Sequence, residues 1–305
     1  MSKFDVVTAF DICVDFLMDL GKIEPEFGQK EKLVNGYGLE MGGSACIFAC
    51  QCSKLGLSTA GVGSIGNDSF GAFMLECLKK DGVDTSFIRN NQEKTALTLC
   101  LNKDGGDRSI LTYMGAMDTV QRAWIEELLP KTRHLHICSY YLLKSLQTAY
   151  PDILKKAKEL GVTVSLDTNW DPDENWDGGI RNILPYVDVF LPNENELMLI
   201  TEQDNVQDAL RYAGVLVPTI IVKCGKDGAY AYQKGEIHKC DALKVTVADT
   251  VGAGDSFNGG FIYGFLSGLS VADCLKAGTI CGSLNASKPG GTAGQPKLAD
   301  LKNYL

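Results

Sequence analysis

Short apolar runs rich in β-branched residues recur along the chain and alternate with longer segments of helical periodicity. The runs lie at residues 4–9, 58–63, 134–139, 162–167, 186–191 and 218–224. Over residues 68–81, apolar side chains recur at i, i+3, i+4, i+7 and i+8, which predicts an amphipathic helix that ends at Gly82. Residues 149–160 repeat this pattern before Gly161. Strands that alternate with helices predict a mostly parallel sheet covered on both faces.

Two segments, residues 11–41 and 92–116, instead predict strands without intervening helices. A polar turn signal at residues 103–107 separates two alternating runs, which is typical of a hairpin. We therefore expect a small β-sheet lid, formed by these two segments and inserted into a single α/β domain over residues 1–305. Residues 254–305 are expected to be nearly all helical.

Charge and composition exclude several classes of protein. The 305 residues include 29 Lys and Arg against 38 Asp and Glu, so the formal net charge of −9 disfavours a protein that grips nucleic acid or anionic lipid. No apolar run reaches the roughly 18 residues of a membrane-spanning helix, and the amino terminus lacks a signal-peptide pattern. The eleven cysteines include no CxxC pair, which predicts reduced thiols in a cytoplasmic protein. His134 and His136 alternate in an expected strand, where a structural role is favoured over a metal pair.

A first glycine motif, Gly61–Gly66, has the GxGxxG form of a dinucleotide-binding turn. That interpretation makes the protein an NAD-dependent oxidoreductase. However, Asp68 begins the next helix and places a carboxylate where a pyrophosphate would lie. A tight strand-to-helix turn with an acidic cap is therefore favoured, and the oxidoreductase stands as the alternative from another class of enzyme.

The densest glycine segment, residues 248–260, follows a run at residues 244–247 that predicts a strand, and it leads into an expected helix. The backbone N–H groups of residues 252–255 would point outward at the start of this helix, which predicts an anion-binding site. Within it, the carboxylate of Asp255 is suited to take a proton from a hydroxyl, and the positive potential there is expected to keep it ionised near neutral pH. An ordinary helix cap is the alternative for Asp255. No Walker A or protein-kinase motif occurs in the sequence.

These segments, in this order, resemble the ribokinase-like (PfkB) carbohydrate kinase family over nearly the whole chain. The segments that carry the resemblance are Asp15, Gly42–Gly43, Gly63–Gly71, Gly106–Ser109, Asp167–Asn169, Asn193–Glu196, Lys223–Gly228, Asp249–Asp255 and Gly290–Pro296. The resemblance implies a three-layer α/β/α fold with a mostly parallel central sheet and a small β-sheet lid. It also implies transfer of the ATP γ-phosphate to a hydroxyl of a sugar or sugar derivative. A nucleoside kinase of the same family is the alternative, with Phe10, Tyr37 or Tyr113 as a platform for the base.

The resemblance also implies a role for individual residues. Asp255 resembles the catalytic base, and Gly252, Ala253 and Gly254 resemble the anion hole. The residues implied to bind ATP are Asn193, Glu196, Lys223, Gly225, Gly228 and Asn285. Among these, Glu196 would hold Mg²⁺ through water, and a monovalent cation such as K⁺ would lie beside the loop of Val251.

The acceptor side of the site is implied in the same way. The residues implied to bind the acceptor are Asp15, Gly42, Gly43, Ser44 and Asn169. Ile47 stands where many family members have an Asn that contacts sugar hydroxyls, so the acceptor is left as a small sugar-like molecule without a name. The lid would exclude water from the reaction, and its open edge predicts a homodimer through the lid.

Overall fold

A nine-stranded sheet lies at the centre of the computed structural model, which describes residues 2–105 and 107–305. In spatial order its strands are β13 (Glu236–Cys240), β12 (Ala229–Gln233), β11 (Thr219–Lys223), β10 (Val189–Phe190), β9 (Thr163–Leu166), β8 (Thr132–Ile137), β1 (Phe4–Ala9), β4 (Thr59–Gly66) and β5 (Ile88–Asn91). The strands from β11 to β5 are parallel, and β12 and β13 are antiparallel additions at one edge. All six strands expected from the apolar runs are present.

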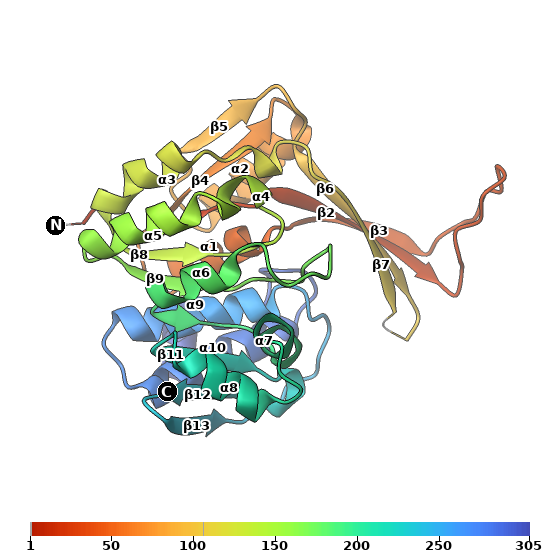
Figure 1. Ribbon diagram of the computed structural model, residues 1–305. Helices are drawn as coiled ribbons and strands as arrows, with labels where there is room; N and C mark the ends of the chain where they lie inside the picture. The colour runs from red at the N-terminus through yellow and green to blue at the C-terminus, as the bar shows by residue number, and fades with distance from the viewer. Residues whose placement is uncertain (1, 106) are drawn as a thin grey trace.

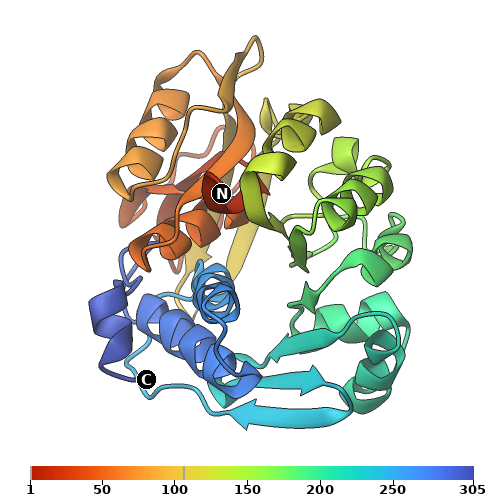
Figure 2. The same cartoon turned by 90° about the vertical axis from the view of Figure 1, so that its left-hand side faces the viewer.

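Helices cover both faces of this sheet, so the predicted three-layer architecture is confirmed (Figure 2). On one face the core is shared with α3 (Arg122–Leu128), α5 (Tyr150–Glu159), α6 (Ile180–Ile183), α7 (Glu194–Thr201) and α8 (Val206–Gly214). On the other face it is shared with α1 (Ser44–Lys54), α2 (Ser69–Lys80), α9 (Ala253–Leu266) and α10 (Val271–Ala286). The neighbours Val6 and Val7 of β1 point to opposite faces, as the alternation of a strand requires. The short helices α4 (Lys144–Gln147) and α11 (Leu298–Lys302) complete the set within the described residues.

The lid is a separate four-stranded sheet that projects from the main body (Figure 1). Its strands, in spatial order, are β3 (Gly36–Met41), β2 (Cys13–Gly21), β6 (Ala96–Lys103) and β7 (Arg108–Tyr113). They come from the two segments that the sequence singled out, although Gly106 of the family motif lies outside the described residues. The lid is therefore assembled from two stretches that are far apart in the chain.

The strand expected at residues 244–247 is wrong. This segment has no regular secondary structure, and the N–H groups of Ala248 and Asp249 donate to the carbonyl of Ala286 at the end of α10. The backbone just after this segment is thus bonded to a helix end and not to a sheet edge. The sheet edge is occupied instead by the β12–β13 hairpin, which the sequence analysis did not predict.

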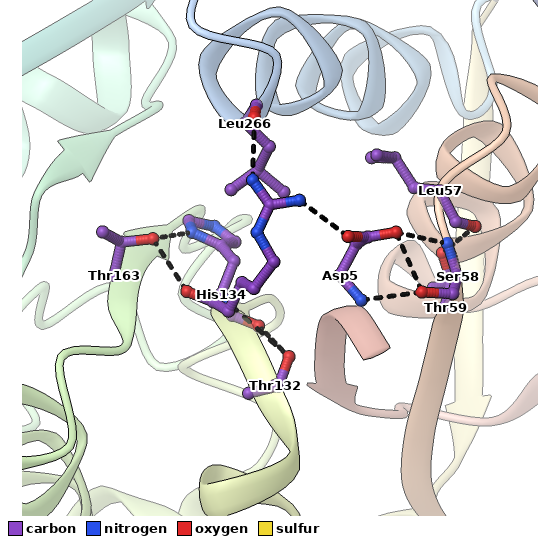
Figure 3. Close-up of polar contacts among 9 residues, drawn as sticks. Asp5, Leu57, Ser58, Thr59, Thr132, His134, Thr163 and Leu266 are labelled. Carbon is purple, nitrogen blue, oxygen red and sulfur yellow. Dashed lines mark hydrogen bonds and ion pairs between the residues drawn. The ribbon is translucent and has the colours of Figure 1, made fainter. Parts of the chain in front are cut away.

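A cluster of polar residues connects the central strands at their amino-terminal ends (Figure 3). Arg133 at β8 donates to Oδ1 of Asp5 in β1 at 2.8 Å and to the carbonyl of Leu266 in α9 at 2.9 Å. Asp5 in turn accepts from the backbone N–H and the hydroxyl of Ser58, just before β4. These bonds link three neighbouring strands and one helix at the edge opposite the glycine-rich turns.

His134 and His136 of β8 are buried and bond to hydroxyl groups of the neighbouring strand β9. Nδ1 of His134 lies 2.8 Å from the hydroxyl of Thr163 (Figure 3). Its Nε2 lies 2.7 Å from the hydroxyl of Ser165. Nδ1 of His136 lies 2.6 Å from the same Ser165 hydroxyl, and burial lowers the pKa of His136 to about 3. Both rings are therefore held neutral between strands, which supports the structural role expected for them.

Residues 2–105 and 107–305 are described here for membrane-spanning helices, metal-ligating clusters and thiols. No helix there combines the length and apolar character needed to cross a bilayer. No group of three or more His, Cys, Asp or Glu side chains converges there as a metal site. The eleven cysteines, all inside these residues, carry free thiols.

Candidate active site

The glycine turn before α9 opens at the carboxyl edge of the central sheet. Gly252 has a left-handed backbone, with φ of 69°, and a Cβ there would lie 2.6 Å from the carbonyl oxygen of Gly291. Only glycine fits this position without strain. α9 starts at the next residue, so Asp255 lies in its first turn with the free N–H groups of the helix end around it.

Burial opposes the ionisation expected for Asp255. Burial raises the pKa of Asp255 well above its usual range, and the charge of Asp167 raises it further, while Lys223 lowers it. The helix dipole is too weak to outweigh removal of the carboxylate from water beside a second carboxylate. The ionised form of Asp255 therefore depends on positive charge brought into the site.

Lys223 and Asp167 form a buried ion pair at the ends of neighbouring elements. Nζ of Lys223, the last residue of β11, lies 2.5 Å from Oδ2 of Asp167, which follows β9. The amide of Asn258 on α9 donates to the same oxygen. The parallel strands of the sheet bring these residues together because their carboxyl ends share one edge. Asp167 is part of the quoted motif, but pattern alone gave no indication of this pair.

Asn193 and Glu196 form a reciprocal cap at the start of α7. Oδ1 of Asn193 accepts from the N–H of Glu196, and Oε2 of Glu196 accepts from the N–H of Asn193, both at 2.9 Å. Burial raises the pKa of Glu196 to about 6, the charge of Asp167 raises it too, and Lys223 lowers it. The cap uses one of the two oxygens of the Glu196 carboxylate and fixes that carboxylate at the site.

A cavity of about 810 Å³ connects these groups. The predicted site residues that line it are Ser44, Asn169, Asn193, Glu196, Lys223, Gly225, Gly228, Ala253, Gly254 and Asp255. Arg108 of the lid strand β7 lines it as well, and so does Trp170. The cavity therefore brings together the glycine turn, the α7 cap and part of the lid. Gly252, Asp15, Gly42, Gly43 and Asn285 lie outside this lining.

Asp15 and Gly42 meet where the lid joins the body. A Cβ on Gly42 would overlap the carboxylate of Asp15, so glycine is required for this approach. Burial raises the pKa of Asp15 to about 7, with a further contribution from Asp11, whereas Arg108 lowers it. Asp15 is paired in the β2–β3 register with Glu40. The lid thus presents several carboxylates and one guanidinium toward the body.

Asp11 was missed as a site residue. Its two carboxylate oxygens accept from the N–H groups of Ser44 at 2.9 Å and Ala45 at 3.0 Å, and Oδ2 also accepts from the hydroxyl of Ser139 at 2.5 Å. Asp11 therefore satisfies the first turn of α1 in place of a local cap. A carboxylate directly after the first buried strand was the signal that could have indicated it.

Asn169 extends this network toward the cavity. Its amide donates to the hydroxyls of Ser44 and Ser139. Both Asn169 and Ser139 have left-handed backbones, with φ of 55° and 51°, directly after β9 and β8. Strained non-glycine residues at strand ends are typical of functional sites. The network fixes Ser44 beside Asp255.

Two residues from the sequence analysis have support roles in the glycine turn. The amide of Asn285, which is fully buried in α10, donates to the carbonyl of Val251 at 3.0 Å, so contact with a bound nucleotide stays a prediction. Ile47 is buried in α1, and its side chain fills the space beside Gly252 and Gly291. The apolar residue at this position therefore packs beneath the turn.

The GxGxxG motif does not form a ligand-binding turn. All of Gly61–Gly66 lies within the buried strand β4, so its N–H groups belong to the sheet. Asp68 caps α2 by accepting from the N–H of Gly71 at 2.8 Å, so the expected acidic cap is present, whereas the tight turn expected at Gly61–Gly66 is wrong because these residues form a strand. The oxidoreductase alternative has no support in this geometry.

Residues 6–298 match the profile of the pfkB family carbohydrate kinase. The chain belongs to the pfkB family of carbohydrate kinases. This carbohydrate kinase is 28% identical over 288 residues to 2-dehydro-3-deoxygluconokinase of Bacillus subtilis, covering 89% of this chain and 88% of that protein. The predicted family and enzyme class are confirmed.

Solved structures share the fold across the whole kinase. A ribokinase from Arabidopsis thaliana, complexed with ribose and ATP, matches with a TM-score of 0.85 at 22% identity, covering 100% of this chain and 99% of that one. A protein from E. coli designated ribokinase II, in complex with ATP and Mg²⁺, matches with a TM-score of 0.85 at 24% identity, covering 99% and 98%. The predicted ribokinase-like fold is therefore confirmed.

Proposed function

We propose that this kinase transfers the γ-phosphate of ATP to a hydroxyl of a small sugar or sugar derivative, with Asp255 as the base. The observation that supports this most directly is the position of Asp255. It lies in the first turn of α9, behind the glycine turn, and lines the cavity opposite Lys223 and the α7 cap. The solved ribokinase with ribose and ATP supports the same pair of substrates.

The glycine turn supplies the anion site of the reaction. The backbone N–H groups of Gly252, Ala253 and Gly254 stabilise charge on the transferred phosphoryl group. Asp255 takes the proton of the acceptor hydroxyl as that group arrives. Its raised pKa makes it a better base once a cation in the site holds it in the ionised form.

Mg²⁺ fits the site as an ion carried by ATP. No three metal-ligating side chains converge within residues 2–105 and 107–305, while the buried carboxylate of Glu196 faces the same cavity. We assign Glu196 to ordering Mg²⁺ through water, and Asn193, Lys223, Gly225 and Gly228 to the nucleotide. When bound, the ion neutralises phosphate charge. K⁺ beside Val251 remains part of the proposal.

The acceptor lies between the lid and the start of α1. Asp15 accepts hydrogen bonds from acceptor hydroxyls, Gly42 and Gly43 permit the close approach, and Ser44 and Asn169 border the acceptor. None of the aromatic residues considered as a nucleoside platform faces Asp15. Phe10 is fully buried, while Tyr37, like Tyr113, lies on the opposite face of the lid from Asp15 by strand register. A sugar is therefore favoured over a nucleoside.

The outer face of the lid supports association with a second copy of the chain. The strand register places an apolar set on this face: Phe16, Met18, Tyr37, Leu39, Leu99, Leu101, Leu111 and Tyr113. All six residues of the edge strand β7 are exposed, so its backbone groups are open to pairing. An identical edge on a second copy offers the same apolar set, and we assign a homodimer to this surface.

An ADP-release screen tests the function. Purified kinase with ATP and Mg²⁺ is offered a panel of sugars, sugar acids, sugar phosphates and nucleosides. We expect ADP release that depends on at least one sugar-type acceptor and that stops in excess EDTA. ADP release that depends only on a nucleoside would show that the acceptor is a nucleoside and not a sugar. ADP release that persists unchanged in EDTA would contradict the Mg²⁺ assignment.

A further inference from the structure

The ammonium group of Lys223 lies inside the proposed active site. The Lys223 side chain is 15% exposed, and its Nζ lies 2.5 Å from Oδ2 of Asp167. A Cβ added to Gly254 would lie 3.7 Å from the same Nζ. The cation therefore stands between the carboxyl end of the sheet and the glycine turn that forms the proposed anion hole.

The surroundings of Lys223 keep it charged. Burial lowers the pKa of Lys223, but Asp167, Glu196 and Asp255 together raise it above its usual value. Three carboxyl groups thus face one ammonium. Arg108, Lys226 and Lys244 also line the cavity, but Lys223 is the cation that lies against the glycine turn, where a bound phosphate would need a positive charge.

Asp167 has a second hydrogen-bond partner besides Lys223. The amide of Asn258 donates to the same Oδ2 that the ammonium contacts. If Lys223 moves toward a bound phosphate, the Asp167 carboxylate keeps a hydrogen bond from α9. Movement of the ammonium is therefore less costly than breaking an isolated buried ion pair.

The sequence has no Walker A lysine to contact the phosphates, and Lys223 places a buried ammonium beside the glycine turn. We propose that Lys223 is a catalytic residue whose ammonium leaves Asp167 when ATP binds and contacts the phosphoryl group during transfer. This inference rests on the proposed function and adds to it the role of Lys223. We expect Lys223 to stabilise the transition state more than it stabilises bound ATP, because the charge around the phosphoryl group changes during transfer.

Lys223 takes no part in the proton transfer that accompanies the proposed step. A bond forms between the acceptor oxygen and the γ-phosphorus, and the bond from that phosphorus to the bridging oxygen breaks. The electron pair of the broken bond leaves with ADP, and the acceptor proton goes to Asp255. Lys223 keeps its protons and donates only hydrogen bonds.

Lys223→Met tests the proposal, since it removes the charge and keeps the length of the side chain. We expect the single-turnover rate to fall by about 10²–10³-fold, which is typical for loss of one transition-state donor. We expect the affinity for ADP with aluminium fluoride, a mimic of the transferring group, to fall far more than the affinity for ADP alone. A folded variant with a wild-type single-turnover rate, or with equal losses for both ligands, would overturn it.

The matched control is Lys239→Met on β13, which removes an exposed lysine paired with Asp241 at 3.2 Å. Its rate and its melting temperature should stay near wild type because exposed pairs contribute little. If Lys223→Met fails to fold, the double variant Lys223→Met/Asp167→Asn removes both buried charges. We expect the double variant to react about 10²-fold more slowly than Asp167→Asn alone. Equal rates would overturn the proposal.

Failure of the proposed function is seen separately. In that case the wild-type protein releases no ADP with any acceptor and does not bind ADP with aluminium fluoride. Failure of the Lys223 proposal leaves the wild-type activity in place and abolishes only the difference between the variants.

Discussion

The carboxylate of Asp15 occupies the space that a side chain at Gly42 would need. This contact joins the lid strand β2 to the loop before α1, and it holds the carboxylate in a largely buried position. The pKa of Asp15 is raised to about 7 by burial, with help from Asp11. The folded state therefore holds this carboxylate at a cost to its own stability at neutral pH and above.

Asp15→Asn should stabilise the free kinase at high pH and weaken binding of the acceptor. The raised pKa means that the folded state binds more protons than the unfolded state between about pH 4 and pH 7, so wild-type stability falls as pH rises through this window. The variant lacks this loss, so we expect its melting temperature to exceed wild type at pH 8 and to match it near pH 4.

Acceptor binding provides the second readout for Asp15→Asn. Loss of the carboxylate should raise the acceptor KM by about 5- to 100-fold, the equivalent of about 1–3 kcal/mol for an unpaired buried group, and leave the ATP KM unchanged. Asp204→Asn, an exposed substitution, serves as the control. A raised ATP KM with an unchanged acceptor KM would reverse the assignment.

Glu196→Gln should alter the response to Mg²⁺. The amide oxygen of Gln can still accept from the N–H of Asn193, so the α7 cap is kept while the charge is lost. We expect the Mg²⁺ concentration at half-maximal rate to rise by about 10-fold, near the low end for loss of a group in an ion's outer shell. The measurement is a Mg²⁺ titration at saturating ATP. A change confined to the acceptor KM would refute the role.

Leu111→Glu should separate the proposed dimer. Leu111 is exposed on the apolar outer face of the lid, and a charge there would have to be buried in the interface. Sedimentation analysis should give a dimer for wild type and a monomer for the variant. Leu160→Glu, at another exposed leucine that follows α5, should remain dimeric. A monomeric wild type would contradict the assignment.

The features that the sequence predicted correctly depend on local pattern. The parallel strands, α2 and α5 follow from periodicity, and the glycine turn before α9 is encoded within a few residues. The pair of Lys223 and Asp167 joins residues 56 positions apart, and Asp11 reaches Ser44 across 33 positions, so no local pattern reveals either contact.

The expectation for Asp255 was incomplete for the same reason. Its helix-start position is local and was predicted, but its pKa is set by burial and by Asp167, which only the folded chain supplies. The strand expected at residues 244–247 failed for a related reason, because the backbone just after it is engaged by the end of α10.

Single-turnover phosphoryl transfer by Asp255→Asn tests the central claim most directly. Asn keeps the size of the side chain, and Asp255 makes no cap hydrogen bond at the start of α9, where Gly252 is the N-cap, so we expect a folded variant with normal ATP binding. The chemical step should fall by about 10²–10⁴-fold because the base is gone. A folded, ATP-binding variant that transfers the phosphoryl group at the wild-type rate would show that Asp255 is not the base, and it would contradict the proposed mechanism.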